Sequence, residues 1–196
     1  METVVVVLGV VAFVVLAWRV GLLVNRFKHR RFVRAWQPLV GIIDGVVHED
    51  PQGGGASSYL AGSWKGRTIH ARMSPHVRSW EWQHHENRFG VGVANVAGRT
   101  SWMTTGDARQ GERGLGVKSD DHALEERLHA AGVVERLRCI QCHSVHFESF
   151  SGYLFLEDTV EPLWAPPPER FVALLDAAVE LARIHDQVNS GSAQGR

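Results

Sequence analysis

The chain has 196 residues, of which 44% are hydrophobic, with 21 basic residues, 21 acidic residues and two cysteines. This length is that of one ordinary domain, two cysteines cannot form a disulfide framework, and such a hydrophobic content excludes a wholly disordered chain. The neutral total conceals a split, because residues 1–40 are net +5 whereas residues 41–196 are net −5. We therefore expect a compact fold with an appendage in different surroundings.

The amino-terminal segment is apolar over the length of a membrane span. Residues 4–24 are apolar or Gly apart from Arg19, and an α-helix of this length extends about 30 Å, the thickness of a hydrocarbon core. Trp18 and the long side chain of Arg19 suit the headgroup depth. A cleaved signal peptide would need a positive start and a small-residue cleavage site, and the segment has neither. The sequence predicts a single transmembrane anchor over residues 1–25.

A basic juxtamembrane segment follows at residues 26–38. Its basic side chains are Arg26, Lys28, Arg30, Arg31 and Arg34. No acid occurs between Glu2 and Asp44, and such a bias marks the cytoplasmic end of a membrane helix. We expect the amino terminus outside and the main domain in the cytoplasm. The basic side chains could also contact anionic lipid headgroups, although a topology signal alone explains them.

The soluble domain is predicted over residues 39–189, with strands first. Short β-rich runs occur at residues 42–47, 59–64, 68–73, 88–94 and 100–104. Lys65-Gly66 and residues 95–98 are typical turns for two hairpins. Apolar residues alternate with small or polar ones in these runs, which predicts a half-buried antiparallel sheet. The glycine-rich residues 49–55 and 106–116 are expected to be loops.

Helical patterns dominate the second half of the domain. Leu124, Leu128 and Ala131 fall on one helical face, with an aspartate before them as a cap and Gly132 as the end, and residues 133–137 add a turn or two. A further hairpin joins residues 145–150 and 153–157. An amphipathic helix follows over residues 169–188, and residues 190–196 form a disordered tail. We predict an α+β domain: a hairpin-rich, mostly antiparallel sheet of five to seven strands with two main helices on one face.

One short motif carries possible chemistry, Cys139-Ile140-Gln141-Cys142-His143. It resembles the haem-attachment motif of c-type cytochromes. The resemblance, which covers these five residues only, implies thioether bonds from Cys139 and Cys142 to haem and His143 as the iron ligand. A second axial ligand would come from one of four other histidines: His70, His76, His84 or His85. Because haem is attached outside the bacterial cytoplasm, this hypothesis would place the domain in the periplasm.

Other interpretations of the same residues stay open. Zinc could be bound by Cys139, Cys142, His143 and His146. The two thiols could instead form a redox pair, or fill the core as small hydrophobic side chains with no cofactor at all.

Other function classes have less support in the sequence. The spaced glycines at residues 111–116 lack the strand and lysine of a phosphate loop, no Gly-x-Ser-x-Gly elbow occurs, and a net charge of −5 argues against nucleic-acid binding. We expect a single-pass, membrane-anchored, non-catalytic module that binds or assembles with something at the membrane surface, such as a protein partner. The alternative is a membrane-tethered haem electron carrier.

Overall fold

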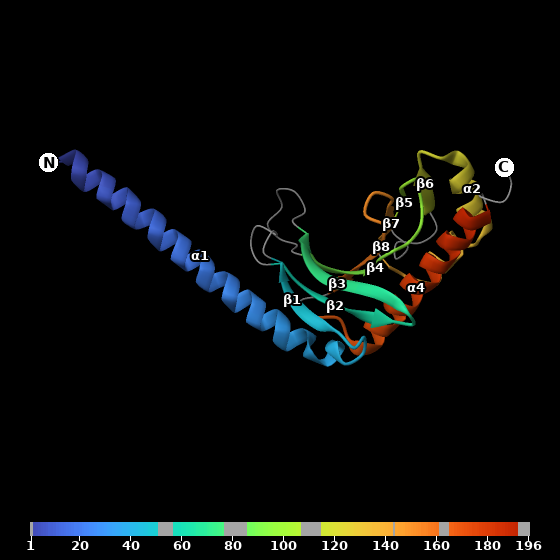
Figure 1. The fold of residues 1–196 in the computed structure, drawn as a ribbon, viewed down its shortest axis with the longest axis horizontal. Coiled ribbons are helices and arrows are strands. Elements are labelled where there is room, and N and C mark those ends of the chain that lie inside the picture. Colours follow the sequence, from blue (N-terminus) through green and yellow to red (C-terminus); the bar gives the residue numbers. More distant parts are fainter. Residues whose placement is uncertain are drawn as a thin grey trace.

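The computed structural model describes residues 2–50, 57–76, 86–106, 115–142, 144–160 and 165–191 (Figure 1). These ranges contain four helices and eight strands. The elements are α1 (Glu2–Val40), β1 (Val46–Asp50), β2 (Ser57–Trp64), β3 (Arg67–His76), β4 (Glu86–Val93), β5 (Trp102–Thr105), β6 (Gly116–Ser119), α2 (His122–Ala130), α3 (Val133–Ile140), β7 (Ser144–Glu148), β8 (Tyr153–Val160) and α4 (Pro168–Gly191).

All eight strands form one antiparallel sheet in the order β1-β2-β3-β4-β8-β7-β5-β6. The predicted α+β class and antiparallel sheet are confirmed, but the expected five to seven strands are too few. The additional strand is β6, which lies at the end of the predicted 106–116 loop. Its four residues include one buried side chain, Val117, so it carries too short an alternation to be recognised in the sequence.

Two of the three predicted hairpins are present, and the third is wrong. Lys65 and Gly66 have φ of 47° and 77°, the left-handed pair that a tight β2–β3 turn requires, and β7 and β8 form the later hairpin. However, β4 pairs with β3 and β8, whereas β5 pairs with β6 and β7. The chain after β4 bonds instead to the β7–β8 turn, through Val96 N–H to Gly152 O at 2.9 Å, and so crosses past two strands.

The first strand begins later than predicted. Residues 41–44 form the turn that ends α1, with Asp44 at φ 45°, and β1 starts at Val46. The Gly45 N–H donates to Val40 O at 3.0 Å. Ile43 is fully buried in this turn, so its apolar side chain belongs to the core rather than to a strand.

Helices cover one face of the sheet. The predicted carboxy-terminal helix is confirmed as α4, whose apolar stripe is buried at Phe171, Leu174, Leu175, Ala178, Leu181 and Ala182. Asp121 caps α2 through its side chain, and Gly132, at φ 76°, separates α2 from α3. Helix α4 runs through Gly191, so residues 190–191 are helical rather than part of a disordered tail, and residues 192–196 lie outside the described ranges.

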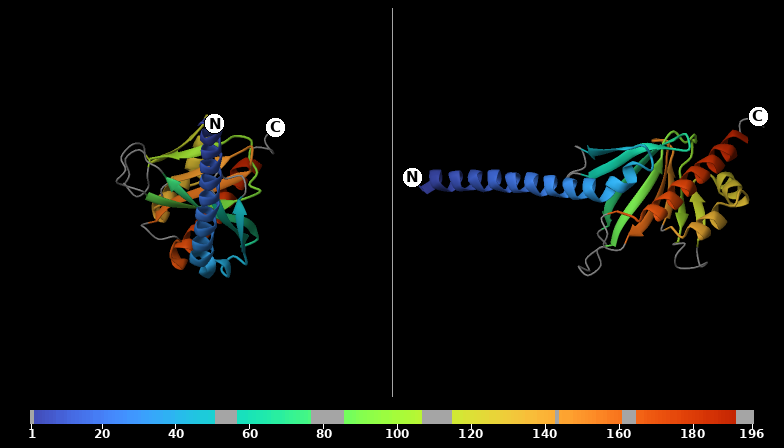
Figure 2. Two further views of the ribbon diagram at one scale, coloured as in Figure 1. Left: turned by 90° about the vertical axis from the view of Figure 1, so that its left-hand side faces the viewer. Right: turned by 90° about the horizontal axis from the view of Figure 1, so that it is seen from below.

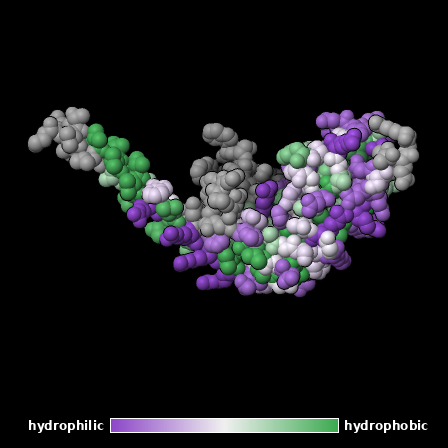
Figure 3. All heavy atoms as spheres, viewed as in Figure 1, coloured by the Kyte–Doolittle hydropathy of each residue, from purple (hydrophilic) through white to green (hydrophobic). Residues whose placement is uncertain are grey.

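Helix α1 is continuous for 39 residues, and its two halves have different surroundings. It is the one helix in the described ranges that is long and apolar enough to cross a membrane. The described apolar side chains between Val6 and Phe27 are exposed, and they form a hydrophobic band that gives way to polar residues toward the domain (Figure 3).

The second half of α1 belongs to the core. Phe32 stacks on Trp36 at 4.7 Å between ring centroids, and Trp36 meets Phe171 of α4 edge-on at 6.0 Å. Phe32, Trp36 and Leu39 are all buried. A domain boundary at residue 39 would therefore cut through the core. Within residues 26–38, the arginines are exposed, whereas Phe32 and Trp36 pack in the core.

The other face of the sheet is open. In two views, strands β1 to β4 lie between the amino-terminal half of α1 and helix α4 (Figures 1 and 2). Helix α4 and the second half of α1 both pack on the covered face, where Trp36 meets Phe171. His29 reaches the buried Ser58 on the same face, so the open face lies on the side of the sheet opposite to both packing contacts. Seen from the amino-terminal end, the strands spread out behind α1 (Figure 2, left).

Candidate functional site

Residues 139–142 of the cysteine motif form the capped end of a helix. Helix α3 ends at Ile140, and Gln141 follows in the left-handed conformation at φ 54°. Arg170 of α4 donates to Ile140 O at 2.8 Å and to Gln141 O at 3.2 Å, and its Nε donates to the buried Asp158 carboxylate at 2.8 Å. This network satisfies carbonyls that a helix end leaves without partners.

The structure separates the sequence-predicted ligands. Cys139 is exposed and Cys142 is buried in the core, both as free thiols. His146 lies on the open face of the sheet, while His143 lies outside the described residues, as do His84 and His85. Within the described ranges, no group of three His, Cys, Asp or Glu side chains could hold a metal ion. The haem, zinc and redox hypotheses stay predictions.

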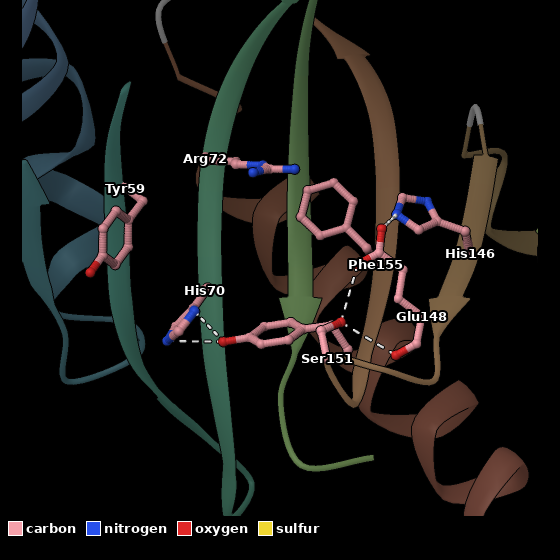
Figure 4. Close-up of a pocket in the computed structure, with 8 residues that line it drawn as sticks. Tyr59, His70, Arg72, His146, Glu148, Ser151 and Phe155 are labelled. Carbon is pink, nitrogen blue, oxygen red and sulfur yellow. Dashed lines mark hydrogen bonds and ion pairs between the residues drawn. The ribbon is translucent and has the colours of Figure 1, made fainter. Parts of the chain in front are cut away.

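A cavity of about 300 Å³ opens on the other side of the sheet (Figure 4). Strands β2, β3, β7 and β8 and the β7–β8 turn supply its walls. Three of its side chains are aromatic: Tyr59, Tyr153 and Phe155. The other five are polar or charged: His70, Arg72, His146, Glu148 and Ser151. These residues alternate along each strand with core residues, which explains why they share one face.

Two glycines of β4 make room for the aromatic wall. In the register, Gly92 lies between His70 of β3 and Phe155 of β8. Gly90 lies on the same face of β4 and pairs with Arg72 of β3. A Cβ atom on Gly90 would lie 2.0 Å from the Phe155 ring, and one on Gly92 would lie 3.0 Å from it. Phe155 therefore lies down over β4, and Tyr153 reaches across to His70.

A hydrogen bond joins the two walls of the cavity. The Tyr153 hydroxyl lies 2.5 Å from His70 Nδ1. Partial burial, and then the nearby His48, lower the pKa of His70, and partial burial, followed by Tyr59, raises the pKa of Tyr153. At neutral pH the imidazole is thus neutral and the phenol protonated. We assign the phenol as donor to Nδ1, which leaves the His70 Nε2–H as a donor.

Two side chains of opposite charge lie at separate positions on the rim of the cavity. The Arg72 guanidinium of β3 lies over the Phe155 ring, 4.9 Å from its centroid. On the β7 side, Glu148 accepts a hydrogen bond from Ser151 at 3.1 Å and lies 3.7 Å from His146 Nε2. Figure 4 shows Phe155 between Arg72 and this acidic group. The cavity therefore offers a cation, an anion and aromatic surface together.

This arrangement suits binding. The hydroxyl of Ser151 is directed to a carboxylate, and the hydroxyl of Tyr153 is directed to His70. Aromatic surface with a few convergent polar groups is typical of a small-molecule site.

Most of this site has no motif in the sequence. Of its residues, the sequence predicts a role for His70 and His146, as haem or metal ligands, and for none of Tyr59, Arg72 and Phe155. The available signal was the alternation Phe89-Gly90-Val91-Gly92-Val93, in which every second residue lacks a side chain. A strand with one aliphatic face and one bare face predicts that something else covers the bare face.

Comparison with known proteins gives no match to a protein-family model, to a curated protein or to a solved structure.

Proposed function

We propose that this protein is a single-pass, membrane-anchored binding module that holds its ligand at the bilayer surface. Residues 4–24 cross the bilayer, the amino terminus lies outside, and the α+β domain lies in the cytoplasm. The open face of the sheet is the binding surface.

The observation that carries the proposal is the rigid join between α1 and the sheet. His29 Nδ1 lies 2.6 Å from Ser58 Oγ, on the covered face of β2. Ser58 precedes Tyr59, whose side chain lines the cavity on the opposite face. His29 follows the last residue of the apolar run, Val24, by about 7 Å of helix. The headgroup layer on each side of a bilayer is about 5–8 Å thick. With α1 upright in the membrane, this end of β2 lies at headgroup depth.

Charge supports the same placement. Exposed guanidinium groups occur on α1 at the level of this join, at Arg26, Arg30, Arg31 and Arg34. With Lys28, these residues set the inside orientation and favour anionic headgroups around the domain.

Depth-dependent quenching tests the proposal. A fluorophore is attached at His48→Cys on β1, in a Cys139→Ser background, and compared with one at the native, exposed Cys139 on α3. The full chain is reconstituted in vesicles that contain lipids with nitroxide headgroups. We expect strong quenching at position 48 and weak quenching at position 139. Equal quenching at both positions would show that the open face is not turned to the bilayer.

Reporter fusions test the side of the membrane. A carboxy-terminal alkaline phosphatase fusion should be inactive and a fluorescent-protein fusion bright, because the former requires export. Active phosphatase would contradict the cytoplasmic placement.

A further inference from the structure

The cavity carries one full charge of each sign, at separate places. Of its described lining residues, Arg72 is the one guanidinium and Glu148 the one carboxylate. No carboxylate in the described part of the chain pairs with Arg72, whose contact is the Phe155 ring. The Glu148 side chain is 44% exposed and keeps acceptor capacity beyond its bond to Ser151. Such a site complements a ligand that is itself a zwitterion.

The chemistry of each end indicates the ligand groups. A guanidinium presents a planar fork of donors that fits phosphate, and the His70 Nε2–H adds a donor on the same strand. An ammonium group suits the other end, where Glu148 provides charge and the rings of Tyr153 and Phe155 provide π faces. The three aromatic rings also accommodate the short hydrocarbon link between the two charges.

The size of the cavity agrees with such a ligand. The cavity of about 300 Å³ lies at the lower end of the range for small-molecule sites. This size suits a compact headgroup such as phosphoethanolamine and not a whole lipid. The acyl chains must therefore lie elsewhere.

Resting on the membrane-surface placement proposed above, we infer that the cavity binds the headgroup of a zwitterionic phospholipid. The phosphate lies at Arg72 and the ammonium at Glu148. The bilayer that holds α1 is the source, because the contact of His29 with Ser58, the residue before Tyr59 in β2, holds this end of the cavity wall at headgroup depth. The acyl chains stay in the bilayer.

The test is a lipid titration of the full chain in a non-ionic detergent, with lipid occupancy measured by native mass spectrometry. The probes are phosphatidylethanolamine, phosphatidylglycerol and free O-phosphoethanolamine. We expect one tightly bound phosphatidylethanolamine per chain, with phosphatidylglycerol and the free headgroup each bound at least about tenfold more weakly.

Matched variants locate the binding site. Arg72→Gln and Glu148→Gln should each weaken phosphatidylethanolamine binding about tenfold, the effect of losing one charge-assisted hydrogen bond. Arg99→Gln and Glu135→Gln change exposed charges elsewhere on the domain and should leave binding unchanged. Thermal unfolding checks that all four variants are folded, which their exposed or half-exposed side chains favour.

Three results would overturn the inference. Binding that is insensitive to both cavity variants would place the lipid elsewhere. Equal affinity for phosphatidylglycerol, with no effect of Glu148→Gln, would exclude the ammonium half. Equal affinity for free O-phosphoethanolamine would make the ligand a soluble molecule, and quenching at position 48 would still support the membrane-surface module. Loss of quenching at position 48, with phosphatidylethanolamine binding intact, would contradict the membrane-surface placement of the module.

Discussion

The two faces of the sheet are made by alternate residues of the same strands, yet they differ in chemistry. The covered face presents Leu60, Ile69 and Val91 to the helices, all fully buried. The open face presents Tyr59 and His70, and between them and Phe155 β4 contributes the two glycines Gly90 and Gly92. Burial of aliphatic surface stabilises the domain from one side, and the other side is left with polar and aromatic groups that a stability argument does not require. This contrast supports the proposal that the open face binds the ligand.

Helix α1 shows the same contrast along its length, and the largest expected effect tests it. Trp36→Ala should lower the free energy of unfolding by about 3–5 kcal/mol, because this fully buried ring joins α1 to Phe171 of α4. Chemical unfolding of the full chain in detergent measures the effect. The exposed neighbour Gln37→Ala is the control and should change it by less than about 0.5 kcal/mol. A loss below about 1 kcal/mol for Trp36→Ala would show that α1 is only a tether.

A polar group on the covered side breaks the simple contrast between the faces. His185 of α4 is fully buried, 4.1 Å from the Phe147 ring centroid. Its backbone carbonyl accepts a hydrogen bond from Asn189 at 2.9 Å. Burial lowers the pKa of His185 to about 4, although the nearby Asp186 opposes the shift.

This pKa predicts acid sensitivity. The unfolded chain takes up a proton near pH 6.5 and the folded chain only near pH 4, so stability is full above pH 6.5 and falls between these values. The loss approaches about 3 kcal/mol at 1.36 kcal/mol per pKa unit. Unfolding measured from pH 7 to pH 4 tests it. His185→Leu should flatten the profile, and His122→Gln should not, because Glu125 raises the pKa of the exposed His122. An unchanged slope in His185→Leu would assign the acid sensitivity to other groups.

The covered face could be predicted from the sequence because it follows simple periodicity. The apolar stripe of α4, the alternation of β2 and β3 and the Lys65-Gly66 turn are local signals, and the structure confirms the element that each predicts. Strand order, in contrast, could not be predicted from local patterns. The pairing of β4 with β8 joins Gly90 to Glu157, far along the chain, and no local pattern specifies such a partner.

The site was less predictable, because it is created by pairing rather than by a motif. Tyr153, His70 and Arg72 come together only when β8 and β3 flank the bare face of β4. The most recognisable motif, around Cys139 and Cys142, instead lies at a helix end that Arg170 caps. The haem, zinc and redox interpretations of this motif stay predictions.

The glycines of β4 sharpen the comparison of the two faces. Gly90→Ala should destabilise the domain by about 1–3 kcal/mol, because its Cβ would lie 2.0 Å from the Phe155 ring, which must move. Gly92→Ala should cost less, since its closest contact would be 3.0 Å. Thermal unfolding measures both. Gly41→Ala, where a Cβ meets nothing within 4 Å, is the control and should be close to neutral. A neutral Gly90→Ala would mean that Phe155 does not lie over β4.

The smallest expected effect distinguishes the two cysteines. Cys142→Ala removes a buried thiol and should cost about 1 kcal/mol, whereas Cys139→Ala on the exposed face of α3 should cost less than about 0.5 kcal/mol. A thiol reagent should label Cys139 in the folded protein and Cys142 only after unfolding, because the reagent must reach the sulfur. Haem or zinc would couple the two sites: both substitutions would then have similar, larger effects, and the protein would carry a covalent chromophore or stoichiometric metal. Unequal effects with unequal labelling would instead assign Cys142 to packing and Cys139 to the surface.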